Sequence, residues 1–386
     1  MYDKQFKFNS DGEFKILLFG DPHEKDDVTS ETGRAKRADT LKFHEAALNA
    51  LKPDLAVYMG DICSASPDDK DISSFKRQLE RLTAPLVERG IPFATIMGNH
   101  DHDSHLEKEQ TKIFTDTELC VTRRCDDDIT GWSNYYILLY GSDGRPKFNL
   151  WFMDSNNLFY DQSVSHYDVV HKDQIDWYEK NAARLRDENN GVPLPALLFE
   201  HIPVIEEYEL LRKAKPWEMW KAVKGHGHHE KTWYVLRDES NGYLAEGPCS
   251  PDINSGQFAS WKKMGDVKGA FFGHDHMNSF AGEVDGILLA QCKTSGFRAY
   301  TDGGRPAVRL ITVHEDGSFE TSVHTFRDFA LKSESLGPIE SRITDRQSVN
   351  ATIASRALIA GAATAAVCIG AGKLYSILKN KESKKW

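Results

Sequence analysis

The chain has 386 residues, enough to bury the core of one large domain. With 40% hydrophobic and 27% charged residues, its composition is that of a globular protein in water. The net charge of −10 argues against a general binder of long nucleic acids, because surplus Lys and Arg hold phosphate backbones. A phosphorylated substrate would need local positive charge, which metal ions can supply.

The first half of the chain alternates short apolar runs with helical periodicity. Runs at 14–19, 54–59 and 92–97 predict buried strands, and residues 34–51 and 71–88 predict the helices between them. Strands that alternate with helices are typical of α/β proteins in which the strands pair mainly in parallel.

The second half is richer in predicted strands. Segments 135–140 and 148–153 flank a Gly-Ser-Asp-Gly turn and predict an antiparallel pair, which the helix 171–188 and the strand 196–199 follow. Further strands are expected at 269–272, 286–291, 307–313 and 318–324, as a second sheet stacked on the first. We therefore expect an α/β (α+β) fold over residues 1–330, a four-layer αββα sandwich of two mixed β-sheets flanked by helices.

Residues 204–246 interrupt this pattern with polar and Trp-rich sequence that lacks strong strand signals. We interpret them as an excursion over the functional site. Trp217, Trp220 and Trp233 are expected to pack against the domain, with stacking on a base or sugar as the alternative. The histidines at 226, 228 and 229 have no accompanying ligand spacing, so a solvated loop is favoured over a second metal site.

Five blocks rich in Asp and His follow predicted strands or lie in the loops beyond them. Aspartate oxygen and imidazole nitrogen both suit divalent metals such as zinc, iron or manganese. Each block alone is weak evidence, since surface or hydrogen-bonded core histidines are common, but the five together indicate a site with two metal ions. Asp61 is the candidate for the carboxylate that bridges them. The blocks are Asp21-Pro-His23, Gly60-Asp61, Gly98-Asn99-His100-Asp101, His201 and Gly273-His274-Asp275-His276.

In this order the blocks resemble the metallophosphoesterase (calcineurin-like phosphoesterase) superfamily, from about residue 14 to residue 323. The segments 249–256 and 273–278 resemble its intracellular, purple-acid-phosphatase-like branch. The resemblance implies that Asp21, His23 and His276 hold one metal ion and that Asn99, His201 and His274 hold the other, with Asp61 as the bridge. It also implies that His100 acts on the substrate without binding metal, and that Asp101 orients His100.

The sequence departs from the motifs of two subgroups of this superfamily. Purple acid phosphatases carry a tyrosine ligand three residues after the bridging aspartate, where this chain has Ser64, so we expect no tyrosinate-to-iron colour. The Ser/Thr protein phosphatases carry Gly-Asp-Tyr-Val-Asp-Arg-Gly, where this chain has Gly60-Asp61-Ile-Cys-Ser-Ala-Ser66. Membership of that subgroup is not expected.

The carboxy-terminal tail, residues 331–386, contains an Ala/Gly-rich stretch at 357–372 followed by a basic end. A membrane span needs about 20 strongly apolar residues, so we expect a helix packed on the domain or on a partner. A membrane anchor over 357–378 is the alternative. Six scattered cysteines and an amino terminus without an apolar signal region predict a cytoplasmic location.

The expected function is hydrolysis of a small phosphomonoester by a binuclear metal centre and a metal-bound hydroxide. The two divalent ions would be manganese, zinc, iron or similar. A phosphodiesterase acting on a nucleotide or nucleic acid is the first alternative. A non-catalytic, metal-stabilised scaffold is the second, because fold resemblance does not guarantee chemistry.

Overall fold

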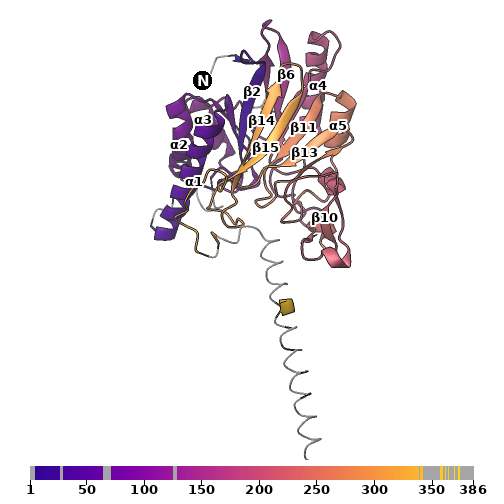
Figure 1. The fold of residues 1–386 in the computed structure, drawn as a ribbon. Coiled ribbons are helices and arrows are strands. Elements are labelled where there is room, and N and C mark those ends of the chain that lie inside the picture. Colours follow the sequence, from indigo (N-terminus) through magenta and orange to yellow (C-terminus); the bar gives the residue numbers. More distant parts are fainter. Residues whose placement is uncertain are drawn as a thin grey trace, which may run out of the picture.

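The structure, a computed structural model, describes residues 5–26, 29–63, 71–124, 128–338 and 340–341, and seven helical positions between 357 and 373. Two large β-sheets pack face to face, and helices cover the outer side of each (Figure 1). The predicted four-layer sandwich of mixed sheets is therefore confirmed.

Five strands form the first sheet. In spatial order they are β15 (Phe319–Thr325), β14 (Ala307–His314), β2 (Glu13–Phe19), β3 (Leu55–Tyr58) and β4 (Phe93–Thr95). The last three run parallel, while β14 pairs antiparallel with both β2 and β15. Because β2, β3 and β4 are parallel neighbours, the loops that follow them open at the same edge of the sheet.

Three helices cover the outer face of this sheet: α1 (Glu31–Leu51), α2 (Ile72–Arg89) and α3 (Glu107–Asp116). Ser30 caps α1 by accepting a hydrogen bond from the backbone N–H of Gly33, and Asp71 caps α2 in the same way. Apolar side chains of these helices, such as Phe43 and Leu79, pack on the sheet in one hydrophobic cluster.

Seven strands form the second sheet. In spatial order they are β1 (Phe6–Lys7), β5 (Tyr135–Tyr140), β6 (Pro146–Phe152), β7 (Ala196–Glu200), β11 (Val267–Phe272), β13 (Ile287–Gln291) and β12 (Ala281–Val284). β5 and β6 are antiparallel, as predicted, whereas β6, β7, β11 and β13 are parallel neighbours. On its outer face lie α4 (Lys172–Glu188) and α5 (Gln257–Met264).

The main core lies between the two sheets. In β2, Ile16 and Leu18 point into this core, whereas Leu17 and Phe19 join the cluster beneath α1 and α2. Strand side chains alternate between faces, so a strand covered on both sides reads as a continuous apolar run. That is why 14–19 could be recognised from sequence.

Two sequence-based expectations about the second half need correction. β14 and β15 do not belong to the second sheet, because β14 pairs with β2 of the first. The excursion 204–246 also has strands: β8 (Leu211–Lys213), β9 (Val223–Lys224) and β10 (Trp233–Leu236) form a small antiparallel sheet. These strands are too short to give a periodic signal.

The excursion also contributes to the core, since Leu211, Val223 and Tyr234 are buried beside the second sheet. Its described residues also include three 3-10 turns: η2 (Ile205–Leu210), η3 (Pro216–Glu218) and η4 (Gly227–His229). Trp217, Trp220 and Trp233 are exposed, so the expectation that they pack against the domain is wrong.

Most of the carboxy-terminal stretch 357–378 lies outside the described residues. Those that are described include Leu358, Ile359 and Ile369, which are helical and exposed. Among the described residues, no helix is long and apolar enough to cross a membrane.

Candidate metal centre

Every candidate ligand lies in a loop just beyond the carboxyl end of a parallel strand. Asp21 and His23 follow β2, Asp61 follows β3, and Asn99 follows β4; from the second sheet, His201 follows β7, and His274 and His276 follow β11. The first sheet thus supplies four candidate ligands and the second supplies three. They meet at one end of the sandwich, where both sheets contribute.

The backbone at this end is strained. Asp21, His23, Asp61 and His274 all have positive φ, between 40° and 70°, which side-chain-bearing residues rarely adopt. Gly60 has a φ of 91°, and a Cβ there would lie 2.5 Å from Nδ1 of His201. Strain held by surrounding structure is typical of functional sites, since it fixes side chains in one geometry.

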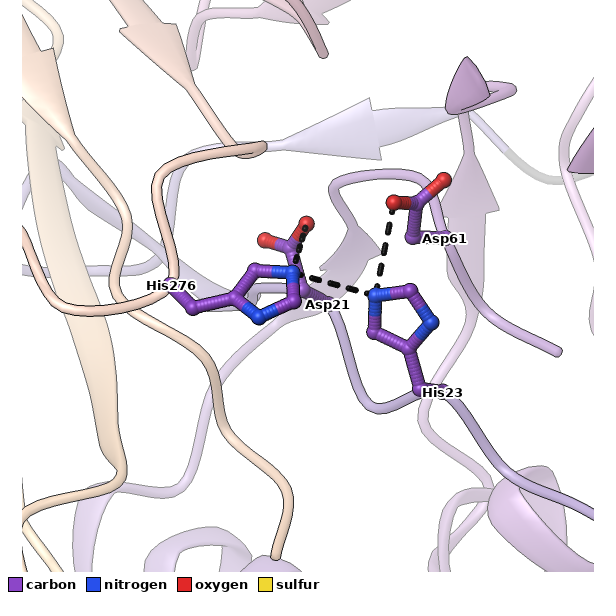
Figure 2. A group of neighbouring side chains, drawn as sticks. All are labelled: Asp21, His23, Asp61 and His276. Carbon is purple, nitrogen blue, oxygen red and sulfur yellow. Dashed lines mark hydrogen bonds and ion pairs between the residues drawn. The ribbon is translucent and has the colours of Figure 1, made fainter. Parts of the chain in front are cut away.

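One group of four side chains could hold a metal ion: Asp21, His23, Asp61 and His276. All four are buried and point toward one another (Figure 2). Nε2 of His23 lies 3.1 Å from Nε2 of His276 and 3.4 Å from Oδ2 of Asp61. Ligand atoms bound to one ion at about 2.0–2.2 Å lie about 3–3.5 Å apart, so this spacing fits a shared cation.

A second group shares Asp61 with the first and adds His201 and His274. Nδ1 of His201 donates to the carbonyl oxygen of Met59 at 2.7 Å, which leaves Nε2 to face Oδ2 of Asp61 at 3.3 Å and Oδ1 of Asn99 at 3.1 Å. A hydrogen bond from the second ring nitrogen to a carbonyl is how proteins orient histidine ligands. The candidate set therefore extends to Asn99.

Oδ2 of Asp61 and Nε2 of His274 are among the buried atoms that lack a hydrogen-bond partner within the described residues. The other oxygen of Asp61 accepts a hydrogen bond from the backbone N–H of His100 at 2.8 Å. A buried polar atom without a partner is costly, and a cation between these groups would remove the cost. The donor set therefore fits metal ions.

Burial and close charges shift several pKa values at the centre. Burial lowers the pKa of His201, but the Asp61 carboxylate outweighs this effect and raises it to about 10. Burial raises the pKa of Asp21 well above its usual value, and the neighbouring Asp61 carboxylate adds to the effect. Burial, then the charge on His201, holds the pKa of His274 well below its usual value. Burial and then His23 lower the pKa of His276 to about 3. These two histidines are thus neutral at pH 7, as metal ligation requires, and a cation would relieve the repulsion between the carboxylates.

The family model for calcineurin-like phosphoesterases matches residues 14–278, which include all seven candidate ligands. The protein belongs to the calcineurin-like phosphoesterase family. This confirms the resemblance from the sequence blocks, and the family's metal-dependent hydrolysis of phosphoesters is the chemistry that these side chains suit.

Several curated proteins are similar to this phosphoesterase. "Probable inactive purple acid phosphatase 14" of Arabidopsis thaliana is 30% identical over 78% of this chain and 75% of its own length. "Probable inactive purple acid phosphatase 29" of the same plant is 26% identical over 90% of each chain. "Phosphatase DCR2" of Saccharomyces cerevisiae is 24% identical over 82% of this chain and 54% of its own. The purple-acid-phosphatase-like resemblance is thereby confirmed.

His100 borders the metal-ligand cluster of this phosphoesterase without joining it. Its half-exposed ring lies with its centroid 5.3 Å from that of His23. Nδ1 contacts Oδ2 of Asp103 at 2.7 Å. The expectation that Asp101 orients His100 is therefore wrong. The carboxylate of Asp101 is buried and accepts backbone N–H groups of Gly98 and Ile62 instead, because the 3-10 turn η1 (Asn99–Asp101) turns it inward.

Two aromatic rings that the sequence did not reveal flank the cluster. Tyr300 stacks on His276 with ring centroids 4.2 Å apart, and its hydroxyl donates to Glu246 at 2.9 Å. Tyr167 meets the ring of His274 edge-on at 4.4 Å and also contacts His226 of the excursion. No motif marks either tyrosine, because each comes from an irregular loop.

Glu24, beside His23, is buried, and Arg37 and Arg81 contact its carboxylate at 2.5 and 3.4 Å. The histidines at 226, 228 and 229 join no potential metal-ligand group among the described residues.

Proposed function

We propose that this protein is a phosphoester hydrolase with a binuclear metal centre, acting as a phosphatase on a small phosphomonoester. The observation that carries the proposal is Asp61, which belongs to both potential metal-ligand groups. Its Oδ2 lies 3.4 Å from Nε2 of His23 and 3.3 Å from Nε2 of His201 and has no hydrogen-bond partner among the described residues. A carboxylate shared by two groups is what a pair of neighbouring ions requires.

In the proposed centre, Asp21, His23 and His276 would hold the first ion. Asn99, His201 and His274 would hold the second, and Asp61 would be shared by both. Asn99 contributes a neutral amide oxygen, which keeps the ligand charge low enough for the site to attract an anionic phosphate.

When bound, two divalent ions would neutralise the phosphate and lower the pKa of water toward about 7. The protein's own part is to place the ester and manage the proton of the leaving oxygen. His100 is the candidate for the second task, because it lies at the rim of the cluster and is half-exposed. Asp103 engages Nδ1, which leaves Nε2 to donate to the leaving oxygen.

Two alternatives remain distinct. A phosphodiesterase would use the same centre on a diester, and the acidic net charge favours a small nucleotide over a long nucleic acid as its substrate. A metal-stabilised scaffold without catalysis is favoured by the words "probable inactive" in the names of the plant relatives. Against it stand the intact candidate ligands and the yeast relative that is named a phosphatase.

Metal analysis combined with hydrolysis of p-nitrophenyl phosphate and its bis ester tests all three functions. We expect about two ions per chain, turnover of the monoester, and loss of more than about 100-fold in turnover with reduced metal content in Asp61→Asn. Preference for the bis ester would favour the diesterase. Bound metal without turnover of either ester would favour the scaffold.

The matched control is Asp143→Asn, which makes the same change in an exposed turn between β5 and β6. It should keep both metal content and turnover. If Asp61→Asn also kept both, the ligand assignment would be wrong.

A further inference from the structure

The small sheet of the excursion exposes several large apolar side chains in one short stretch. Trp217, Trp220 and Trp233 are 72%, 49% and 42% exposed, and Met219 is exposed as well. Burying such rings within the protein would be favourable, so a stretch that displays four of these side chains marks a surface that contacts something else. Residues 212–233 are called the Trp/Lys surface below.

A rigid turn holds these rings outward. Trp217, Met219 and Trp220 lie in and just after the 3-10 turn η3 (Pro216–Glu218), which joins β8 to β9. Glu218 is buried at its centre: both of its carboxylate oxygens accept hydrogen bonds from Arg212 at 2.7 Å, and one also accepts from the backbone N–H of Lys215. The outward rings are thus built into the fold of the turn.

Trp233 belongs to the same stretch of chain and lies on β10. It pairs with Lys224 of β9, and its carbonyl oxygen accepts a hydrogen bond from the backbone N–H of Ala214, next to β8. Trp233 therefore lies between the two outer strands and shares a face of the small sheet with Lys224, whereas Lys213 pairs with Tyr234. In Figure 1, β10 lies at the lower right, below β13 and α5.

The charge of this surface is opposite to that of the whole chain. Residues 212–233 contain six Lys or Arg against two Glu, a net charge of +4 in a chain of −10. One of the two acids, Glu218, is neutralised by Arg212. Four lysines are exposed and make no ion pair with a carboxylate of the described residues: Lys213, Lys215, Lys224 and Lys231.

Exposed tryptophan and lysine side chains in one stretch suit contact with an anionic lipid surface. Indole rings settle at the boundary between headgroups and acyl chains, and clustered lysines are attracted to anionic headgroups. We propose that the Trp/Lys surface binds the surface of an anionic lipid bilayer, without spanning it. This inference is independent of the proposed hydrolysis, because none of its residues belongs to the candidate metal centre.

Co-sedimentation of the full chain with vesicles tests the proposal. We expect binding to phosphatidylcholine vesicles that contain phosphatidylserine, little binding to phosphatidylcholine alone, and weakening as salt is added. Trp217→Ala/Trp220→Ala should lower the partition constant about tenfold, by removing apolar contact area. Lys213→Gln/Lys215→Gln should lower it by a similar factor, about tenfold, and reduce the salt dependence.

The controls change equally exposed residues elsewhere: Val192→Ser, and Lys108→Gln/Lys268→Gln. Both should leave binding unchanged, and circular dichroism should show native folding in every variant. Full binding by the tryptophan variant would overturn the proposal and transfer the contact to another part of the chain, such as the basic tail. Equal binding to neutral and anionic vesicles, or no binding to either, would overturn it too, and would leave a protein partner as the occupant.

Discussion

His100 and its carboxylate partner show how much of the candidate site depends on single side chains. The sequence places Asp101 directly after His100, yet the ring contacts Asp103, because Asp101 faces inward to the backbone N–H groups of Gly98 and Ile62. The two carboxylates therefore have separable tasks. Asp103 contacts the ring that we propose acts on the substrate, and Asp101 holds the loop that carries His100 and Asn99.

Replacing each carboxylate by its amide should separate these tasks. Asp103→Asn should lower kcat about tenfold and leave metal content and melting temperature unchanged, because only the His100 ring loses its partner. Asp101→Asn should lower the melting temperature and the metal content, because a buried carboxylate that accepts backbone donors is lost. Steady-state kinetics, metal analysis and thermal unfolding of both variants provide the measurements. If both variants changed kcat, metal content and melting temperature equally, the two carboxylates would not have separate tasks.

Tyr300 is a second residue whose task follows from geometry. Nδ1 of His276 is buried and has no hydrogen-bond partner within the described residues, so no such bond fixes the ring. Instead, Tyr300 stacks on it, and Glu246 fixes Tyr300 by accepting from its hydroxyl and from the backbone N–H of Met277. The stacked ring takes over the orienting task that a hydrogen bond performs for His201.

Tyr300→Ala should therefore weaken metal binding about tenfold, within the range known for partners of metal ligands. Tyr300→Phe keeps the stacked ring and should lose less. Competition of Mn²⁺ or Zn²⁺ against a chelating dye measures the affinity directly, without reference to turnover. Tyr160→Ala, a change at an exposed ring elsewhere, is the control and should have no effect. If Tyr300→Ala left the metal affinity unchanged, Tyr300 would not be needed to orient His276.

At the scale of elements, the end of strand β7 combines apolar packing with buried polar groups. β7 ends in Glu200 and continues into His201, and alternation along the strand sends these two side chains to opposite faces. His201 faces the candidate metal centre. The Glu200 side chain lies on the outer face, where Oε2 accepts a hydrogen bond from Gln257 of α5 at 2.6 Å. Its other oxygen is buried without a hydrogen-bond partner among the described residues.

Glu200 should make stability depend on pH. Burial raises its pKa to about 8, above the 4.5 expected in the unfolded chain. Because of this raised pKa, the contribution of Glu200 to stability is fully present below about pH 4.5. It is lost as the pH rises from 4.5 through about 8, where the buried carboxyl group ionises. Glu200→Gln keeps the acceptor for Gln257 and does not ionise. Urea unfolding should therefore show Glu200→Gln to be more stable than the natural protein at pH 9, and the difference should shrink toward pH 5. A difference that does not change with pH would contradict the assigned pKa.

At the scale of the whole molecule, the local part of the site could be predicted from sequence and the long-range part could not. Asp21, Asp61 and His274 were recognisable because each follows an apolar run that ends in a loop, and chain order reports such features directly. The pairing of β14 with β2 could not be predicted, since nearly 300 residues separate the two strands and neither sequence indicates which strand it pairs with. The ring of Tyr300 on His276 escaped prediction because Tyr300 lies in an irregular loop, where no periodic pattern indicates the direction of a side chain.

The candidate ligands come from both sheets, and this gives the whole molecule a testable property. Each proposed ion would bind residues of the first sheet, such as Asp21, together with residues of the second, such as His276. Metal bound to the folded state alone stabilises it by about 2.7 kcal/mol when its concentration is 100 times the dissociation constant. Removal of metal by a chelator should lower the melting temperature by several degrees, and Mn²⁺ or Zn²⁺ should restore it.

Asp61→Asn makes this prediction specific to the cluster. Its side chain is the one shared by both ligand groups, so the variant should lose most of the metal-dependent rise in melting temperature. His324→Gln, at a partly exposed histidine on β15, should keep the full rise. Differential scanning calorimetry of the three proteins with and without metal is the measurement, and it needs no substrate. If metal raised the melting temperature of Asp61→Asn equally, the stabilising metal would bind elsewhere. If the rise occurred only in proteins that keep Asp61, the metal would stabilise the contact between the two sheets at this centre, whether or not the protein hydrolyses an ester.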